Sequence, residues 1–126
     1  MRKGRRGVLG SHAVGVVIWE VKSLEVVTIC GSMRFANEMK KIALLLEKTH
    51  NMSVLQCVYN EEEIKLSDEE IKKLNEAHYR KIQIADAIYV VNLNGYIGEQ
   101  VRREIAFAEK IGKKVIFHSN FYSENK

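Results

Sequence analysis

The sequence predicts an α/β domain, doubly wound around a parallel sheet of four to five strands with helices on both faces. Three observations predict it. From residue 26 onward, short β-branched segments alternate with longer amphipathic ones. The intervening helices are long enough for right-handed crossovers, which pair strands in parallel. The 126 residues contain no proline and no repeat or low-complexity tract to mark a linker, so we expect a single domain.

The elements follow in chain order from hydrophobic spacing. Residues 26–30 form a β-branched strand, and residues 33–48 form a helix with apolar side chains every three or four positions. Residues 53–58 are the second strand. The capping sequence at residues 67–70 opens a helix that runs to about residue 85, with apolar residues at positions 71, 74, 82 and 85 on its inward side.

The second half of the pattern repeats the first. Residues 86–92 form the third strand, residues 98–111 the third helix, and Gly112 ends that helix before a fourth strand at residues 114–118. In such flavodoxin- or Rossmann-like sheets, ligands bind beyond the carboxyl ends of the strands, where the strand order reverses. The loops at residues 31–32 and 92–98 fall at that edge.

The ends of the chain differ from this pattern. Residues 1–25 carry five basic and two acidic side chains, a net charge of +3 out of +4 for the whole sequence. This basic extension is either disordered or adds an edge strand at residues 14–21. The domain itself covers residues 26–120 and has almost no net charge, which argues against a nucleic-acid polymer as partner. Residues 121–126 are a C-terminal tail.

Cysteine content and hydropathy bound the location. Cys30 and Cys57 lack CxxC spacing, so we expect unpaired thiols in a reducing, cytoplasmic compartment and no zinc site. The apolar run at residues 13–18 is too short to span a membrane. No membrane partner is expected.

Glu104 lies on the face of the third helix that should be buried. The residues that share this face, at positions 101, 105, 108 and 111, are all apolar. Removing an ionised carboxylate from water costs several kcal/mol unless partners compensate. Glu104 is therefore either a buried, paired carboxylate or a group placed for chemistry as nucleophile or general base.

The first loop carries Gly31, Ser32 and Arg34 at the start of a helix. Backbone N–H groups, a small hydroxyl and a guanidinium there form a candidate anion or phosphate site. The alternative is that Gly31 is a turn residue and Ser32 a helix N-cap. The chain contains neither a Walker A motif nor GxGxxG.

His78 shares the inward side of the second helix. A histidine on an apolar stripe is more often a hydrogen-bonded core residue than a catalyst, so its role in a site is the weaker alternative. Asn92, Asn94 and Tyr96 follow the third strand and offer further polar contacts at the rim. Arg102 and Arg103 fall on the outward face of the third helix, where they are solvated or contact another subunit.

Four segments in this order resemble the nucleoside 2-deoxyribosyltransferase superfamily. They are Thr-Ile-Cys-Gly-Ser-Met-Arg at residues 28–34, Ala-Asp-Ala-Ile-Tyr-Val-Val at 85–91, Glu-Ile-Ala-Phe-Ala at 104–108 and Gly-Lys-Lys-Val at 112–115. The nearest branch is the 2'-deoxynucleoside 5'-phosphate N-hydrolases, whose first loop is also Gly-Ser-hydrophobic-Arg. The resemblance covers residues 26–118.

The resemblance implies a reaction and a site. Glu104 matches the family's nucleophile, which attacks C1' of the deoxyribose and forms a covalent glycosyl-enzyme intermediate. The first loop matches the segment that lies near sugar and phosphate, and Asp86 matches a structural aspartate at a strand start. The mechanism needs no metal or organic cofactor, and family members assemble as homodimers or larger homo-oligomers.

Three positions differ from the family. Asn94 stands where the transferases carry aspartate, Gly98 where the hydrolase branch carries a serine, and Tyr79 near the position of an acidic residue in that branch. We expect a small-molecule nucleoside or nucleotide substrate, with hydrolysis favoured over base exchange. Two other hypotheses stay open: a non-catalytic nucleotide-binding module of the same fold, and a small α/β interaction protein.

Overall fold

The computed structural model describes residues 25–125, with side chains to Tyr122. The predicted extension, including the edge strand at residues 14–21, therefore lies outside the described residues except at Glu25. The elements in chain order are β1 (Glu25–Gly31), η1 (Met33–Phe35), α2 (Ala36–Thr49), β2 (Met52–Leu55), α3 (Asp68–Ile84), β3 (Ala87–Val91), η2 (Leu93–Gly95), α4 (Glu99–Lys110), β4 (Lys114–Phe117) and α5 (His118–Asn125).

The four strands form one parallel sheet in the order β2-β1-β3-β4. This confirms the predicted α/β class. The chain passes from β1 outward to β2 and then returns to place β3 on the other side of β1, so strand order reverses between β1 and β3. Ligand sites in such sheets lie beyond the carboxyl ends of the strands at this point.

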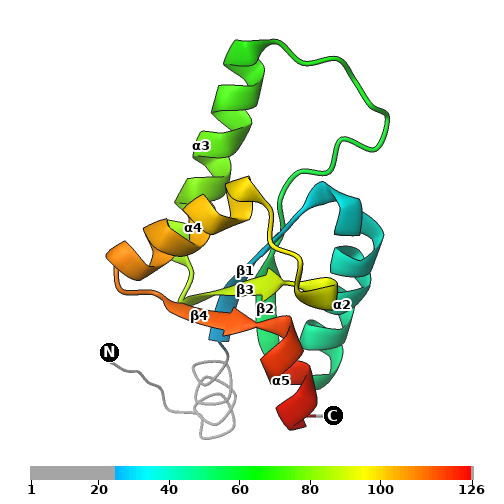
Figure 1. Ribbon diagram of the computed structural model, residues 1–126, viewed down its shortest axis with the longest axis vertical. Coiled ribbons are helices and arrows are strands. Elements are labelled where there is room, and N and C mark those ends of the chain that lie inside the picture. The colour runs from blue at the N-terminus through cyan, green and yellow to red at the C-terminus, as the bar shows by residue number, and fades with distance from the viewer. Residues whose placement is uncertain (1–24, 126) are drawn as a thin grey trace, which may run out of the picture.

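Helices lie on both faces of the sheet (Figure 1), and a hydrophobic cluster fills the space between each face and its helices. On one face, Val27 and Ile29 pack against α2, and Phe121 of α5 joins them. On the other face, Cys30 lies among residues of α3 and α4, including Ile82. Alternate β1 residues therefore point to opposite helical layers, as a strand buried on both sides requires.

Short local motifs mark the start of α3, the end of α4 and the start of β3. The capping box predicted at residues 67–70 is present: Ser67 Oγ accepts from Glu70 N at 3.1 Å, and Glu70 Oε1 accepts from Ser67 N at 2.9 Å. Gly112 terminates α4 with φ of 79°. Asp86 has a structural contact, because its Oδ2 accepts from Val26 N at 2.9 Å.

Several predicted boundaries were wrong. The second strand is shorter than residues 53–58, because β2 is an edge strand that pairs only with residues 25–28 of β1. The first helix does not start at Met33. A separate 3₁₀ turn precedes α2, and its last residue, Phe35, has non-helical backbone angles. The expected C-terminal tail, residues 121–126, is mostly helical, because α5 runs from His118 to Asn125.

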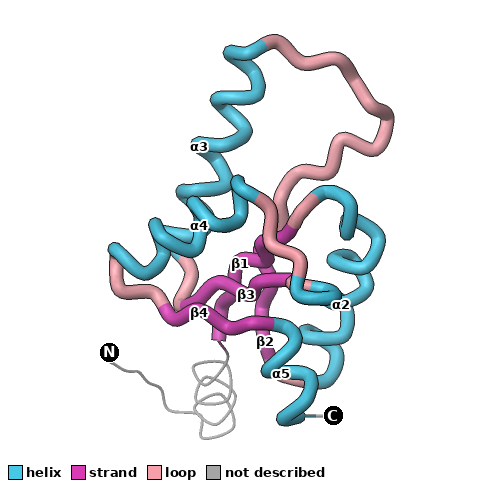
Figure 2. The backbone as a smooth tube through the Cα atoms, viewed as in Figure 1, coloured by secondary structure: helices cyan, strands magenta, loops and turns pink. Residues whose placement is uncertain are grey.

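The inward stripe predicted for α3 holds only for its second half. Ile82 is fully buried, but Ile71 and Leu74 are 44% and 39% exposed. The reason is length: 17 helical residues span roughly 25 Å, whereas the five residues of β3 span roughly 17 Å. The N-terminal half of α3 therefore projects past the sheet, joined to β2 by the long loop visible in Figure 2.

Within residues 25–125, no helix combines the length and apolar character that crossing a membrane would require.

Candidate active site

A pocket of about 620 Å³ opens at the carboxyl edge of the sheet, with walls from the end of β1, the loop after β2, α3 and the start of α4. Six of the predicted site residues line it: Gly31, Ser32, His78, Tyr96, Gly98 and Glu104. The other three, Arg34, Asn92 and Asn94, are outside the lining. The volume is within the range of about 300–1,000 Å³ typical of small-molecule sites.

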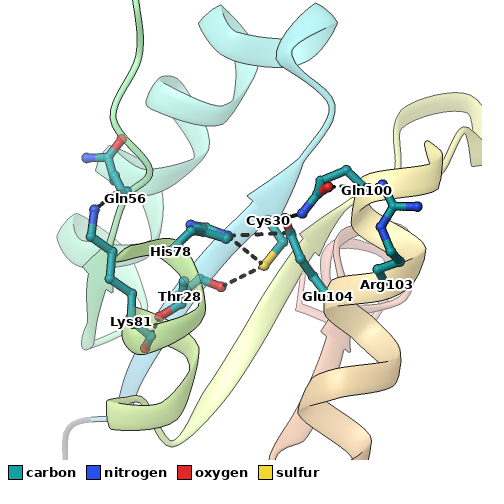
Figure 3. A network of polar contacts seen from close by, with 8 residues as sticks. All are labelled: Thr28, Cys30, Gln56, His78, Lys81, Gln100, Arg103 and Glu104. Carbon is teal, nitrogen blue, oxygen red and sulfur yellow. Dashed lines mark hydrogen bonds and ion pairs between the residues drawn. The ribbon is translucent and has the colours of Figure 1, made fainter. Parts of the chain in front are cut away.

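Glu104 forms the buried wall of this pocket. Helical phase puts it on the same face as Val101 and Ala108, and only 6% of the residue is exposed. Gln100, one turn earlier on α4, donates from Nε2 to Glu104 Oε2 at 3.1 Å. The other carboxylate oxygen, Oε1, lies 3.4 Å from His78 Nε2. Gln100 therefore orients the carboxylate with Oε1 toward α3 (Figure 3).

His78 reaches this point from α3. The hydroxyl of Thr28 donates to the Lys81 backbone carbonyl at 2.7 Å, and Ile82 is fully buried, so the second half of α3 is fixed against β1. His78 Nε2 then lies 3.5 Å from Cys30 Sγ. Its other ring nitrogen, Nδ1, is buried and has no hydrogen-bond partner among the described residues. The expected hydrogen-bonded core histidine is thus only half satisfied.

Cys30, expected from the sequence only as an unpaired thiol, lies beside His78. It is 1% exposed, and its thiol is within 3.9 Å of the Thr28 carbonyl. Burial, and secondarily the neighbouring Glu104 carboxylate, raise the pKa of the Cys30 thiol well above its ordinary value. The thiol is therefore protonated near neutral pH and is a poor nucleophile. Its position at the end of the first strand was the available signal.

These three side chains do not form a cysteine–histidine–carboxylate relay. In such a relay, the nucleophile and the carboxylate bond to opposite nitrogens of the imidazole. Here Cys30 and Glu104 both approach Nε2 of His78, whereas Nδ1 faces no acceptor in residues 25–125. The arrangement leaves Glu104 as the best-placed reactive group of the three.

The first loop combines a capping role with a close backbone approach. Ser32 Oγ accepts from Arg34 N at 3.3 Å, so Ser32 is the N-cap of η1. A Cβ on Gly31 would lie 2.9 Å from Met39 Sδ and 3.2 Å from Val91 Cβ. Glycine fits this close passage of β1 along α2 and β3, whereas any larger residue would force Met39 and Val91 to shift.

Arg34 and Tyr96 form a stacked pair at the rim. The guanidinium carbon lies 3.8 Å from the centre of the Tyr96 ring, a cation–π geometry. Phe35 meets the same ring edge-on, with centroids 6.0 Å apart. This pairing connects the first loop to the loop before α4. Arg34 itself is exposed and does not line the pocket.

The two asparagines after β3 have structural contacts instead. Asn92 Oδ1 accepts from Ser119 N, and Asn92 Nδ2 donates to Ser119 Oγ, both at 3.1 Å, which ties η2 to the start of α5. Asn94 is exposed and has φ of 55°, a left-handed conformation that asparagine tolerates. Arg102 and Arg103 are exposed on α4, as predicted.

Comparisons with protein-family models, with curated proteins and with solved structures found no match for this chain. The resemblance to the nucleoside 2-deoxyribosyltransferase superfamily stays a prediction from sequence motifs.

Proposed function

We propose that this protein cleaves the N-glycosidic bond of a 2'-deoxynucleoside or its 5'-monophosphate, with Glu104 as nucleophile. The observation that carries the proposal is the burial and orientation of the Glu104 carboxylate. It is buried in the wall of a pocket at the carboxyl edge of a parallel sheet, with one oxygen hydrogen-bonded by Gln100 and the other turned toward His78. A desolvated, oriented carboxylate suits attack on an electron-poor carbon.

The reaction proceeds in two displacements. Glu104 Oε1 forms a bond to C1' of the deoxyribose while the C1'–N bond breaks, and the departing base takes up a proton. Water then attacks C1', gives up a proton and releases Glu104 as a carboxylate. The net change consumes one water and yields free base and deoxyribose or its phosphate. If a second base replaces water, the same intermediate supports transfer.

Base release from a panel of deoxynucleosides and their 5'-monophosphates tests the activity. The wild type should release free base, and Glu104→Gln should lower the rate by at least ~1,000-fold, because the nucleophile is lost. Glu109→Gln is the matched control, since Glu109 is an exposed carboxylate on the same helix. The absence of release from the whole panel by wild type would refute the proposal.

Mass spectrometry locates the covalent step. Incubation with a 2-fluoro-2-deoxy nucleoside should leave a sugar adduct on the peptide that contains Glu104, because the fluorine slows breakdown of the intermediate. An adduct elsewhere would assign the nucleophile to another residue. Thermal stabilisation by a nucleotide without any turnover would favour the non-catalytic binding module.

We also propose that the chain assembles as a homo-oligomer in the cytoplasm. Apolar side chains gather on α3 and the loop before it, where Val58, Ile64, Ile71 and Leu74 are all exposed. A second subunit covering this projecting segment would bury them and close the open side of the pocket. Light scattering at micromolar concentration tests this, and a strict monomer would contradict it. The two free thiols fit a reducing compartment.

A further inference from the structure

We propose that Cys30, His78 and Glu104 together bind a thiophilic divalent cation of the Zn²⁺ class, and that the bound ion switches off Glu104 as a nucleophile. The regulatory half of this inference rests on the proposed function, whereas the binding site does not. The three residues come from β1, α3 and α4 and are far apart in sequence. Their ligand atoms nevertheless all lie within 4.8 Å of one another.

Two of the three separations between these donor atoms match those of ligands around one ion. Zinc bonds of about 2.3 Å to sulfur and 2.0–2.1 Å to nitrogen or oxygen, at tetrahedral angles, separate sulfur from nitrogen by about 3.5 Å and nitrogen from oxygen by about 3.4 Å. The observed separations are 3.5 Å for Cys30 Sγ to His78 Nε2 and 3.4 Å for His78 Nε2 to Glu104 Oε1. A direct charge-assisted hydrogen bond would be shorter, about 2.7–2.9 Å.

The surroundings orient these ligands without occupying them. Gln100 holds Glu104 Oε2 and leaves Oε1 turned toward His78. Only Nε2 of His78 faces the other two donors, and Nδ1 has no partner in the described residues, so the imidazole can ligate through Nε2 with its proton on Nδ1. His78 and Glu104 also line the pocket, which leaves a fourth coordination position open to water.

The donor set selects the kind of cation. A thiolate with an imidazole and one carboxylate suits Zn²⁺ and its neighbours in softness, such as Co²⁺, and does not suit Mg²⁺ or Ca²⁺. Binding exchanges the Cys30 thiol proton for the metal: the S–H bond breaks, an S–metal bond forms and one proton leaves to solvent. No electron is transferred, so no oxidant or reductant is needed.

Cobalt spectroscopy tests the site directly. Co²⁺ added to the reduced, metal-free full-length protein should give a near-ultraviolet charge-transfer band from thiolate to cobalt. It should also give visible absorption bands with the intensity typical of tetrahedral Co²⁺. Both signals should saturate at one equivalent of Co²⁺ per chain. Zn²⁺ should displace the cobalt and abolish the bands. If the wild type shows no thiolate band, the inference is overturned before any variant is made.

Variants identify the ligands. The charge-transfer band should disappear in Cys30→Ser and persist in Cys57→Ala, which removes the only other thiol in the chain. His78→Gln and Glu104→Gln should keep the thiol but weaken cobalt binding on the order of 100-fold, at least as much as loss of an outer-shell partner costs. A band that survives Cys30→Ser but not Cys57→Ala would overturn the assignment.

Inhibition by Zn²⁺ tests the regulatory half. If wild type releases free base, Zn²⁺ should stop release and a chelator should restore it. In Cys30→Ser, the Zn²⁺ concentration for half inhibition should rise on the order of 100-fold, relative to that variant's own uninhibited rate. Cobalt bands in a protein that releases no base would refute the proposed glycosidase activity and support the proposed metal site. Base release that Zn²⁺ does not inhibit would refute the switch.

Discussion

Replacing Glu104 with glutamine should leave the protein as stable as wild type or make it more stable, even though it removes the proposed nucleophile. Glu104 is 6% exposed, so its carboxylate loses most of its hydration when the chain folds, which costs several kcal/mol. The hydrogen bond from Gln100 at 3.1 Å returns about 1.5–3 kcal/mol. His78 Nε2, at 3.4 Å, is too distant for a strong charge-assisted bond.

The amide is cheaper to bury. Its desolvation costs about 1–3 kcal/mol, and a neutral hydrogen bond to Gln100 returns about 0.5–1.5 kcal/mol. The balance favours glutamine by roughly 0–2 kcal/mol. This corresponds to an unchanged Tm or a rise of up to roughly 10 °C. A catalytic group that lowers stability should show this result when it is replaced: activity is lost and stability is unchanged or higher.

Thermal and urea denaturation near neutral pH, with a chelator present to exclude metal binding, measure the difference. The matched control is again Glu109→Gln, whose exposed side chain should change stability by less than about 0.5 kcal/mol. A loss of more than about 2 kcal/mol in Glu104→Gln alone would refute the reasoning. It would show that Glu104 is a structural ion-pair partner, as the interaction-protein hypothesis requires.

Three further predictions concern the fold around the site. Gly31→Ala should cost about 1–3 kcal/mol by overpacking against Met39 and Val91; in urea titrations, Gly98→Ala should change stability less, because its Cβ would meet nothing closer than 3.5 Å, and equal losses would contradict the packing argument. Tyr89→Phe should lower the free energy of unfolding by about 1–3 kcal/mol, because it leaves the part-buried His118 Nδ1 without its 2.6 Å hydrogen bond; an unchanged midpoint would show that this bond contributes nothing. Burial lowers the pKa of His118, so the unfolded chain binds its proton first on acidification: stability is complete above pH ~6.5 and falls below it. Between pH 7.5 and 5, the Tm of wild type should therefore fall more steeply with decreasing pH than the Tm of His118→Asn. An equal fall in Tm for both proteins would count against this role of His118.

Local patterns in the sequence were enough for the fold class. A strand buried on both faces reads as a continuous apolar run, and residues 87–91 do so. The capping box at Ser67 and the stop at Gly112 depend on a few neighbouring residues, so both were predictable. The inward position of Glu104 follows from helical period alone.

Other features depend on how long elements are relative to one another. Ile71 and Leu74 satisfy the helical pattern but are exposed, because α3 extends past the short strands it packs on. Periodicity predicts the side of a helix on which a residue lies and carries no information about where the neighbouring layer ends. Phe35, at the break before α2, and Phe121, in α5, both pack against the core on the α2 face of the sheet, a contact between distant segments that periodicity does not encode.

By itself, the sequence determined the parallel α/β class, the sheet edge at which the candidate site lies, and an inward carboxylate on the helix that follows β3. These are properties of periods and caps, which act over a few residues. Only the tertiary structure decided that Cys30, His78 and Glu104 converge, with both neighbours on one nitrogen of His78. That meeting depends on the register of β1 with β3 and on the positions of α3 and α4, and no local pattern encodes distances between separate elements.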